Sequence, residues 1–174
     1  MPHSAALPFT LKRSQDVLGS GSYTSTTETV HGLLRLDGGR VVIQWRLARK
    51  TEHIGNEIRT DRELEAVQEV VLPIDVLAGA QVRAPWLGLF GGGKLVLTAA
   101  DLQAFEAVAG EGGLRLRHPA ELVVRIRRSD RMLAEEFSAE LALAVAERAL
   151  ELHQKRALDR GRERSVGEGQ GGSV

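Results

Sequence analysis

The sequence predicts a mainly β protein of the α+β class, in which a curved sheet is followed by one long C-terminal helix. Three observations lead to this fold class. Apolar and polar residues alternate in several short runs, which is typical of strands with one buried face. Glycine-rich segments separate these runs, as turns do. From Ser129 onward, apolar residues recur at helical spacing among Ala, Leu and Glu, the best helix formers.

The composition predicts one globular domain. The chain has 174 residues, 43% of them hydrophobic, which is enough for a single core. It contains no cysteine, and this excludes disulfides, thiolate metal sites and cysteine nucleophiles. Lys plus Arg and Asp plus Glu both total 23, and this balance argues against a dedicated nucleic-acid-binding protein. Without a signal peptide or a membrane-spanning run, the chain is expected to be soluble and cytoplasmic.

The domain boundaries follow from changes in composition along the chain. We expect an N-terminal tail over residues 1–12, a single domain over 13–158 and a disordered, glycine-rich tail over 159–174. Within the domain, the small polar residues of Gly19–Thr29 indicate a surface loop. The charged segment Arg49–Glu63 has no apolar period and is expected to be a long connection, either functional or disordered.

The first expected hairpin joins the apolar runs Val30–Leu36 and Arg40–Ala48. The turn between them is Asp37–Gly39, and Asp-Gly between β-branched runs is a strong hairpin signal. In the second run, the side chains of alternate residues share one apolar face, as in a half-buried strand. These residues are Val41, Ile43, Trp45 and Leu47.

About five further short strands are expected before the helix, giving a seven-stranded sheet. They lie in "EVVLP", "AQVRAPW" and "KLVLTA", and in "LRLRHPAELVVRIRR", where two strands meet at His118-Pro119. A helical turn is expected in "DLQAFEAVAGEGG". A curved sheet or partly open barrel, capped at one end by the helix of about residues 130–158, would cover the exposed strand edges.

The segment Gly88–Leu95 partly matches a phosphate-binding loop. Gly88, Gly93 and Lys94 have the required spacing, but Leu95 stands where a serine or threonine would hold magnesium. A phosphate-binding loop also precedes a helix, whereas "LVLTA" has high strand propensity. We therefore expect a β-hairpin here, with Trp86, Leu87 and Leu89 ending one strand, Gly91 to Gly93 turning, and Leu95 and Leu97 beginning the next.

From about Val30 to Ala149, the order of these elements resembles that of bacterial pleckstrin-homology-like domains. The resemblance is carried by "LLRLDGGRVVIQW", "EVVLPIDVLAGAQVR", "LFGGGKLVLTAADLQAF", "ELVVRI" and "SDRMLAEEFSAELALAVAE". The resemblance implies a binding or assembly module without catalysis. The fold alone does not determine which ligand such a module binds. Lipid-binding members use basic residues around the first hairpin loop. Here that loop is short and contains Asp37, which argues against lipid binding.

We therefore expect a non-catalytic interaction or assembly module that needs no cofactor. No two of the five histidines have the spacing of metal ligands, so a metal site is not expected. The alternative is an enzyme or small-ligand carrier, with a pocket at the barrel mouth lined by residues 49–63 and 88–94.

Four arginines form a candidate patch for an anionic partner. They alternate with apolar residues in two segments that would pair across the His118-Pro119 turn, and would then lie on one outer face. They are Arg115, Arg117, Arg125 and Arg127. Ordinary solvation of an exposed strand face explains the same pattern.

The C-terminal helix carries two apolar stripes on different faces. One comprises Leu133, Phe137, Leu141, Ala144 and Val145 and is expected to pack on the sheet as far as about Val145. The second comprises Ala139, Leu143, Ala146 and Leu150, spaced alternately four and three residues apart. The second stripe is a candidate interface for self-association or for a partner protein. Alternatively, it reflects only the abundance of alanine, because Leu143 and Leu150 are its only large residues.

Overall fold

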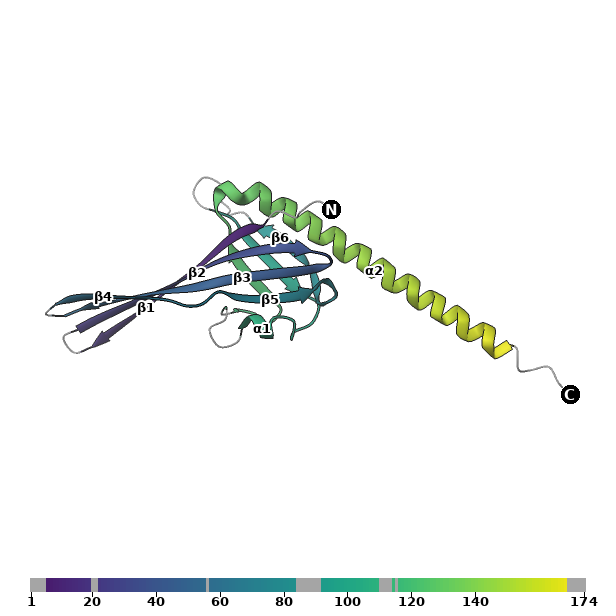
Figure 1. Cartoon of the computed structure of the whole chain (residues 1–174), viewed down its shortest axis with the longest axis horizontal. Helices are drawn as coiled ribbons and strands as arrows, with labels where there is room; N and C mark the ends of the chain where they lie inside the picture. The colour runs from purple at the N-terminus through teal and green to yellow at the C-terminus, as the bar shows by residue number, and fades with distance from the viewer. Residues whose placement is uncertain are drawn as a thin grey trace.

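The protein is an eight-stranded antiparallel sheet followed by one long helix, as seen in a computed structural model (Figure 1). The structure describes residues 6–19, 22–55, 57–83, 92–109, 114 and 116–168. The strands are β1 (Leu7–Gly19), β2 (Ser22–Asp37), β3 (Arg40–Ile54), β4 (Ile58–Leu64), β5 (Gln68–Pro73), β6 (Leu77–Arg83), β7 (Lys94–Ala99) and β8 (Glu121–Arg125). The helices are α1 (Glu106–Ala109) and α2 (Arg131–Glu168), with short 3-10 turns η1 (Ile74–Val76) and η2 (Arg128–Asp130). The predicted mainly β fold with a long C-terminal helix is confirmed.

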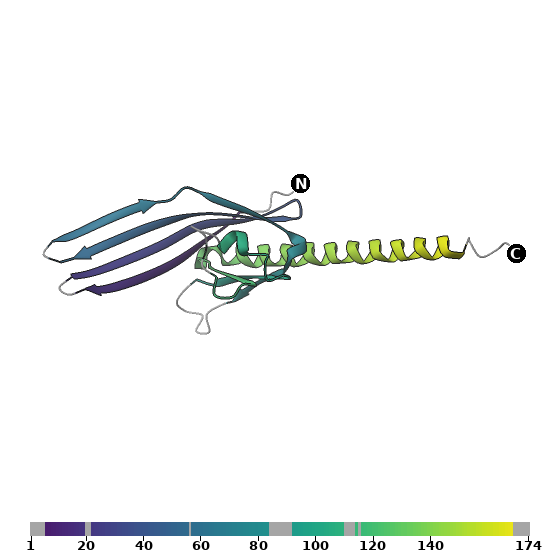
Figure 2. The same cartoon turned by 90° about the horizontal axis from the view of Figure 1, so that it is seen from below.

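The sheet is curved and does not close into a barrel. Its strand order is β4-β3-β2-β1-β8-β7-β6, and β5 pairs with β3 beside β4. β4 pairs with the far end of β3 and β5 with its near end, so both lie along one edge of that long strand. The sheet therefore has a wide curved part, which forms the body, and a narrow four-stranded part that extends from it (Figure 2).

The predicted first hairpin is confirmed. Asp37 pairs with Arg40 across the turn, and Gly38 and Gly39 have φ angles of 52° and 80°. Two successive residues with positive φ define the turn type whose twist matches that of antiparallel strands, and glycine adopts it without steric cost. The β2–β3 ladder that starts here runs on to Tyr23 and Ile54.

The predicted loop over Gly19–Thr29 and the predicted connection over Arg49–Glu63 are both wrong. Residues 22–29 belong to β2, and residues 49–54 and 58–63 belong to β3 and β4. Together with the outer half of β1, these segments form a four-stranded extension, which we call the arm and define as residues 12–19, 22–29, 48–54 and 58–64. No apolar period marks it because neither face is buried.

Two predicted tails are shorter than expected. Residues 7–12 lie in β1, where Leu7 and Phe9 are buried, so they are part of the domain. At the other end, α2 continues past residue 158 to Glu168. Its C-terminal part extends from the body on the side opposite the arm (Figures 1 and 2).

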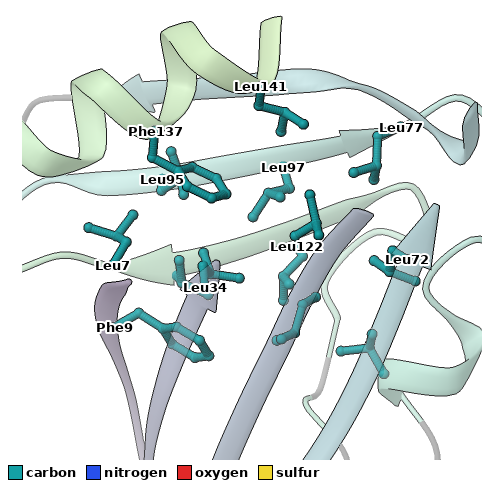
Figure 3. Close-up of a cluster of buried hydrophobic side chains, with 14 of the residues drawn as sticks. Leu7, Phe9, Leu34, Leu72, Leu77, Leu95, Leu97, Leu122, Phe137 and Leu141 are labelled. Carbon is teal, nitrogen blue, oxygen red and sulfur yellow. The ribbon is translucent and has the colours of Figure 1, made fainter. Parts of the chain in front are cut away.

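The core lies between the inner surface of the curved sheet and α2 (Figure 3). Phe137 and Leu141 of α2 are buried against it, and Leu133, Ala144 and Val145 are partly buried. The predicted sheet-facing stripe of the helix is therefore confirmed. Phe105 and Val108, both within the segment predicted to form a helical turn, are also buried, and Val108 lies in α1. The apolar core thus comes from β1–β3, β5–β8, α1 and the first half of α2.

Two polar contacts join α2 to the body at the open edge of the sheet. Ser138 Oγ donates a hydrogen bond of 2.7 Å to the carbonyl oxygen of Ala80 on β6, an edge strand. Farther along, Arg148 Nε and Nη2 lie 2.7 and 3.2 Å from the two carboxylate oxygens of Asp75 in η1. The first contact satisfies an edge carbonyl, and the second holds the turn of α2 around Arg148 against η1.

The segment after Lys94 is a strand, as expected for a hairpin. Lys94 pairs with Arg83 at the end of β6, and β7 continues to Ala99. A phosphate-binding loop would need a helix at this point. The predicted strand end at Trp86, Leu87 and Leu89 and the start of the turn at Gly91 lie outside the described residues.

Candidate interaction surfaces

The arm has two faces of different character. In antiparallel strands, directly paired residues share a face, and successive residues alternate between faces. One face, which we call the core-side face, continues into the body as the buried surface that contains Leu7, Phe9 and Trp45. The opposite one, the outer face, has no buried residue along the arm.

The core-side face of the arm is held by ion pairs. Arg13, Glu28, Arg49 and Glu63 form one cross-strand row of alternating charge. Arg49 lies 3.3 Å from Glu28 and 2.8 Å from Glu63, and hydrogen bonding to Glu28 is the main cause of its raised pKa. These side chains therefore satisfy one another across β2, β3 and β4.

The outer face of the arm carries three cations, Lys12, Lys50 and Arg62, and two acids, Asp16 and Glu52. Lys50 and Arg62 are directly opposed on β3 and β4, and Lys12 lies on the same face of β1. Among the described residues, no carboxylate lies within ion-pair distance of Lys12 or Arg62, while Lys50 pairs with Glu52. Like charges directly opposite each other destabilise a sheet. An anionic group bound beside Lys50 and Arg62 would relieve that repulsion.

A groove of about 700 Å³ lies beside these cations. Its apolar lining includes Ala48 and Leu64, and Thr27 and Thr29 add hydroxyl and methyl groups. A second depression of about 490 Å³ continues toward the body around His31 and Arg46. A groove therefore lies near residues 49–63, where a pocket was predicted. It lies on the outer face of strands and not among loops at a barrel mouth.

The tip of the arm is apolar on its outer face. Leu18, Tyr23, Ile54 and Ile58 form the last row across all four strands. Leu18 is 82% exposed and Ile58 78% exposed. Sequence reasoning missed this row because its members are far apart in the chain and meet only through the strand register.

The structure brings together part of the predicted arginine patch. Arg125 lies exposed at the end of β8, opposite Lys94 and Thr10, and Arg127 follows it. Leu122, Val124 and Ile126 are buried, so the predicted alternation in this segment is confirmed. Arg117 is exposed but lies outside any strand, and Arg115 lies outside the described residues. The paired strand expected before His118 is not formed by residues 114, 116 and 117.

The predicted second stripe of α2 is exposed. Leu143 and Leu150 are 60% and 59% exposed, and Ala139 and Ala146 are also exposed. Met132, seven residues before Ala139, extends the stripe and is 82% exposed. At about 100° per residue, this stripe lies on the side of α2 opposite the buried residues Ala134 and Leu141.

Two glutamates lie along one border of the exposed stripe of α2. At about 100° per residue, Glu136 and Glu147 lie on nearly the same side of the helix, next to Leu143. Neither is within ion-pair distance of a cation among the residues that the structure describes. The exposed side of α2 is thus apolar with an acidic border.

The described residues offer no metal site and no membrane span. No group of three His, Asp or Glu side chains in the described ranges could hold a metal ion. None of the described helices is long and apolar enough to cross a bilayer.

The chain matches no protein-family model, no curated protein and no solved structure. Its fold and surfaces therefore define it only as a β-rich α+β domain with two extensions, a four-stranded arm and a helix.

Proposed function

We propose that this protein is a non-catalytic assembly module that associates with itself through the exposed stripe of α2. The observation that carries the proposal is the position of Met132, Leu143 and Leu150, which are large, apolar and exposed on the helix face opposite the body. Apolar side chains gathered on one exposed face are typical of protein–protein contacts. The order of antiparallel strands followed by a C-terminal helix fits a pleckstrin-homology-like scaffold, a fold that often serves binding.

The length of α2 supports the same proposal. Among the described residues, Arg148 is the last of α2 with a hydrogen bond to the body, and from there the helix continues to Glu168, over about 30 Å at about 1.5 Å per residue. In proteins, helical stability comes mostly from the packing of an apolar face. Contact with a second chain would supply that packing.

Light scattering coupled to size-exclusion chromatography tests the proposal. The full chain is expected to elute as a dimer or larger species, and the double variant Leu143→Glu/Leu150→Glu as a monomer. Leu152→Glu is the matched control, since it makes the same change on the opposite side of the same helix. A monomeric wild-type chain at high concentration would contradict the proposal.

A further inference from the structure

We infer that the acidic, apolar side of α2 of one copy binds the outer face of the arm of a second copy, so that the chains assemble head to tail. This inference rests on the proposed self-association and names the surface that α2 contacts. It also explains why the cations Lys12 and Arg62 and the acids Glu136 and Glu147 lack ion-pair partners among the described residues.

The part of the outer face beside the groove is cationic, the exposed side of α2 is acidic, and both have apolar centres. On the arm, Lys50 and Arg62 border a groove lined by Leu64, which is 60% exposed. On α2, Glu136 and Glu147 border Leu143 and Leu150. Burial of the leucines against Leu64 would remove apolar area from water, and the flanking charges would set the orientation of the helix.

The spacing of the charges also agrees. Lys12 on β1 and Arg62 on β4 are three strands apart and offset by two residues. That separation is about 16 Å at about 4.8 Å between strands and about 3.3 Å per residue. Glu136 and Glu147 are eleven residues apart on α2, which is also about 16 Å at about 1.5 Å per residue, and they point to nearly the same side.

The contact must join different chains. Ser138 and Arg148 hold the contacting part of α2 on the body with its exposed stripe facing away, and α2 and the arm extend in opposite directions, so α2 cannot fold back onto the arm of its own chain (Figures 1 and 2). A contact between two different surfaces is heterologous, and such contacts produce rings or open chains of subunits. In such an assembly each copy uses its arm in one contact and its α2 in another, and only the ends of an open chain keep a free arm or a free helix.

This geometry predicts a specific result when two defective variants are mixed. The arm variant Lys50→Glu/Arg62→Glu keeps its helix surface, and the helix variant Leu143→Glu/Leu150→Glu keeps its arm. Each variant alone is expected to be monomeric by light scattering. An equimolar mixture is expected to form a 1:1 dimer and nothing larger, because only one productive contact remains.

The matched control reverses two cations on the other face of the arm. Arg13→Glu/Arg59→Glu makes the same change in net charge on the core-side face, where it places Glu beside Glu28 and Asp61, and once circular dichroism shows that it is folded it is expected to assemble like the wild type. Circular dichroism establishes that the arm variant is folded, and the milder Lys50→Gln/Arg62→Gln is expected to weaken assembly in the same direction. Assembly of the wild type should also weaken as salt is added, because the flanking contacts are ionic.

The outcomes separate this inference from the proposed function. If the arm variant still self-associates like the wild type while the helix variant is monomeric, α2 is an interface but the arm is not its partner, and the inference is overturned. A mixture that stays monomeric also overturns it. A wild-type chain that is itself monomeric overturns both.

Discussion

At the scale of single residues, Gly32 shows how strand packing depends on the absence of a side chain. It lies between Phe9 and Trp45 in one cross-strand row. An added Cβ would lie 2.2 Å from the Phe9 ring and 2.7 Å from the carbonyl oxygen of Gln44. The ring of Phe9 therefore covers the strand where glycine leaves room, an arrangement known to stabilise glycine in sheets.

Gly32→Ala is expected to destabilise the protein by about 1–3 kcal/mol, the usual cost of forcing atoms into a packed core. Urea unfolding followed by tryptophan fluorescence measures this cost. Gly55→Ala is the matched control, because a Cβ there meets no atom within 4 Å, and its free energy of unfolding should stay close to the wild-type value. Equal stability of the two variants would show that Phe9 can move away without cost.

The ion pair between Asp75 and Arg148 makes a second prediction at this scale. Hydrogen bonding from Arg148 lowers the pKa of Asp75 below its ordinary value of 3.8. A carboxylate with a lowered folded pKa stabilises the protein above the unfolded pKa, and this contribution disappears as the pH falls through the folded pKa. Arg148→Ala is therefore expected to raise the pKa of Asp75 toward 3.8 and to destabilise the protein only above the acidic range.

An NMR titration of the Asp75 carboxyl carbon measures this shift directly. Arg156→Ala removes another exposed arginine of α2 and should leave the titration of Asp75 unchanged. If Asp75 titrates identically in Arg148→Ala and in the wild type, the ion pair does not persist in solution.

At the scale of elements, the sequence pattern was reliable where one face of a strand or helix is buried. β8 and the sheet-facing stripe of α2 were predicted because their apolar residues repeat with the period of the element. The arm was missed because both of its faces meet solvent, so its strands carry no apolar period. The β propensity of threonine in Thr24–Thr29 was the available signal. The groove on the arm could not be predicted because its residues meet only through the register of four strands.

The two faces of α2 predict opposite responses to the same substitution. Leu141 is fully buried, so Leu141→Ala is expected to cost about 2–5 kcal/mol. Leu143, two residues away, is 60% exposed, so Leu143→Ala in the monomeric state is expected to change stability by less than about 0.5 kcal/mol. Chemical denaturation at low protein concentration measures the free energy of unfolding of each variant and of the wild type. A large loss in Leu143→Ala would mean that this face also packs within the monomer.

At the scale of the whole molecule, the body contains the apolar core and the two extensions contain none of it. No buried core residue among those described comes from the arm or from the part of α2 beyond Arg148. A domain owes most of its stability to apolar surface buried in its core. The body is therefore expected to fold without the arm, although the arm includes much of β1–β4. The arm and the free part of α2 would then serve as contact surfaces. A chain without the arm is expected to fold but not to assemble.

Deletion of residues 14–27 and 50–62, each replaced by Asn-Gly, tests this expectation. The cuts keep the ion-paired row Arg13–Glu28–Arg49–Glu63, and each new turn joins residues that already face each other across two strands. The shortened chain is expected to unfold cooperatively near the wild-type temperature, with Trp45 still buried, since its neighbours in the core are unchanged. It is also expected to be monomeric where the full chain assembles, because Lys50 and Arg62 are gone. Loss of cooperative unfolding would show instead that the arm stabilises the body, and its outer face would then have to be tested by charge reversal alone.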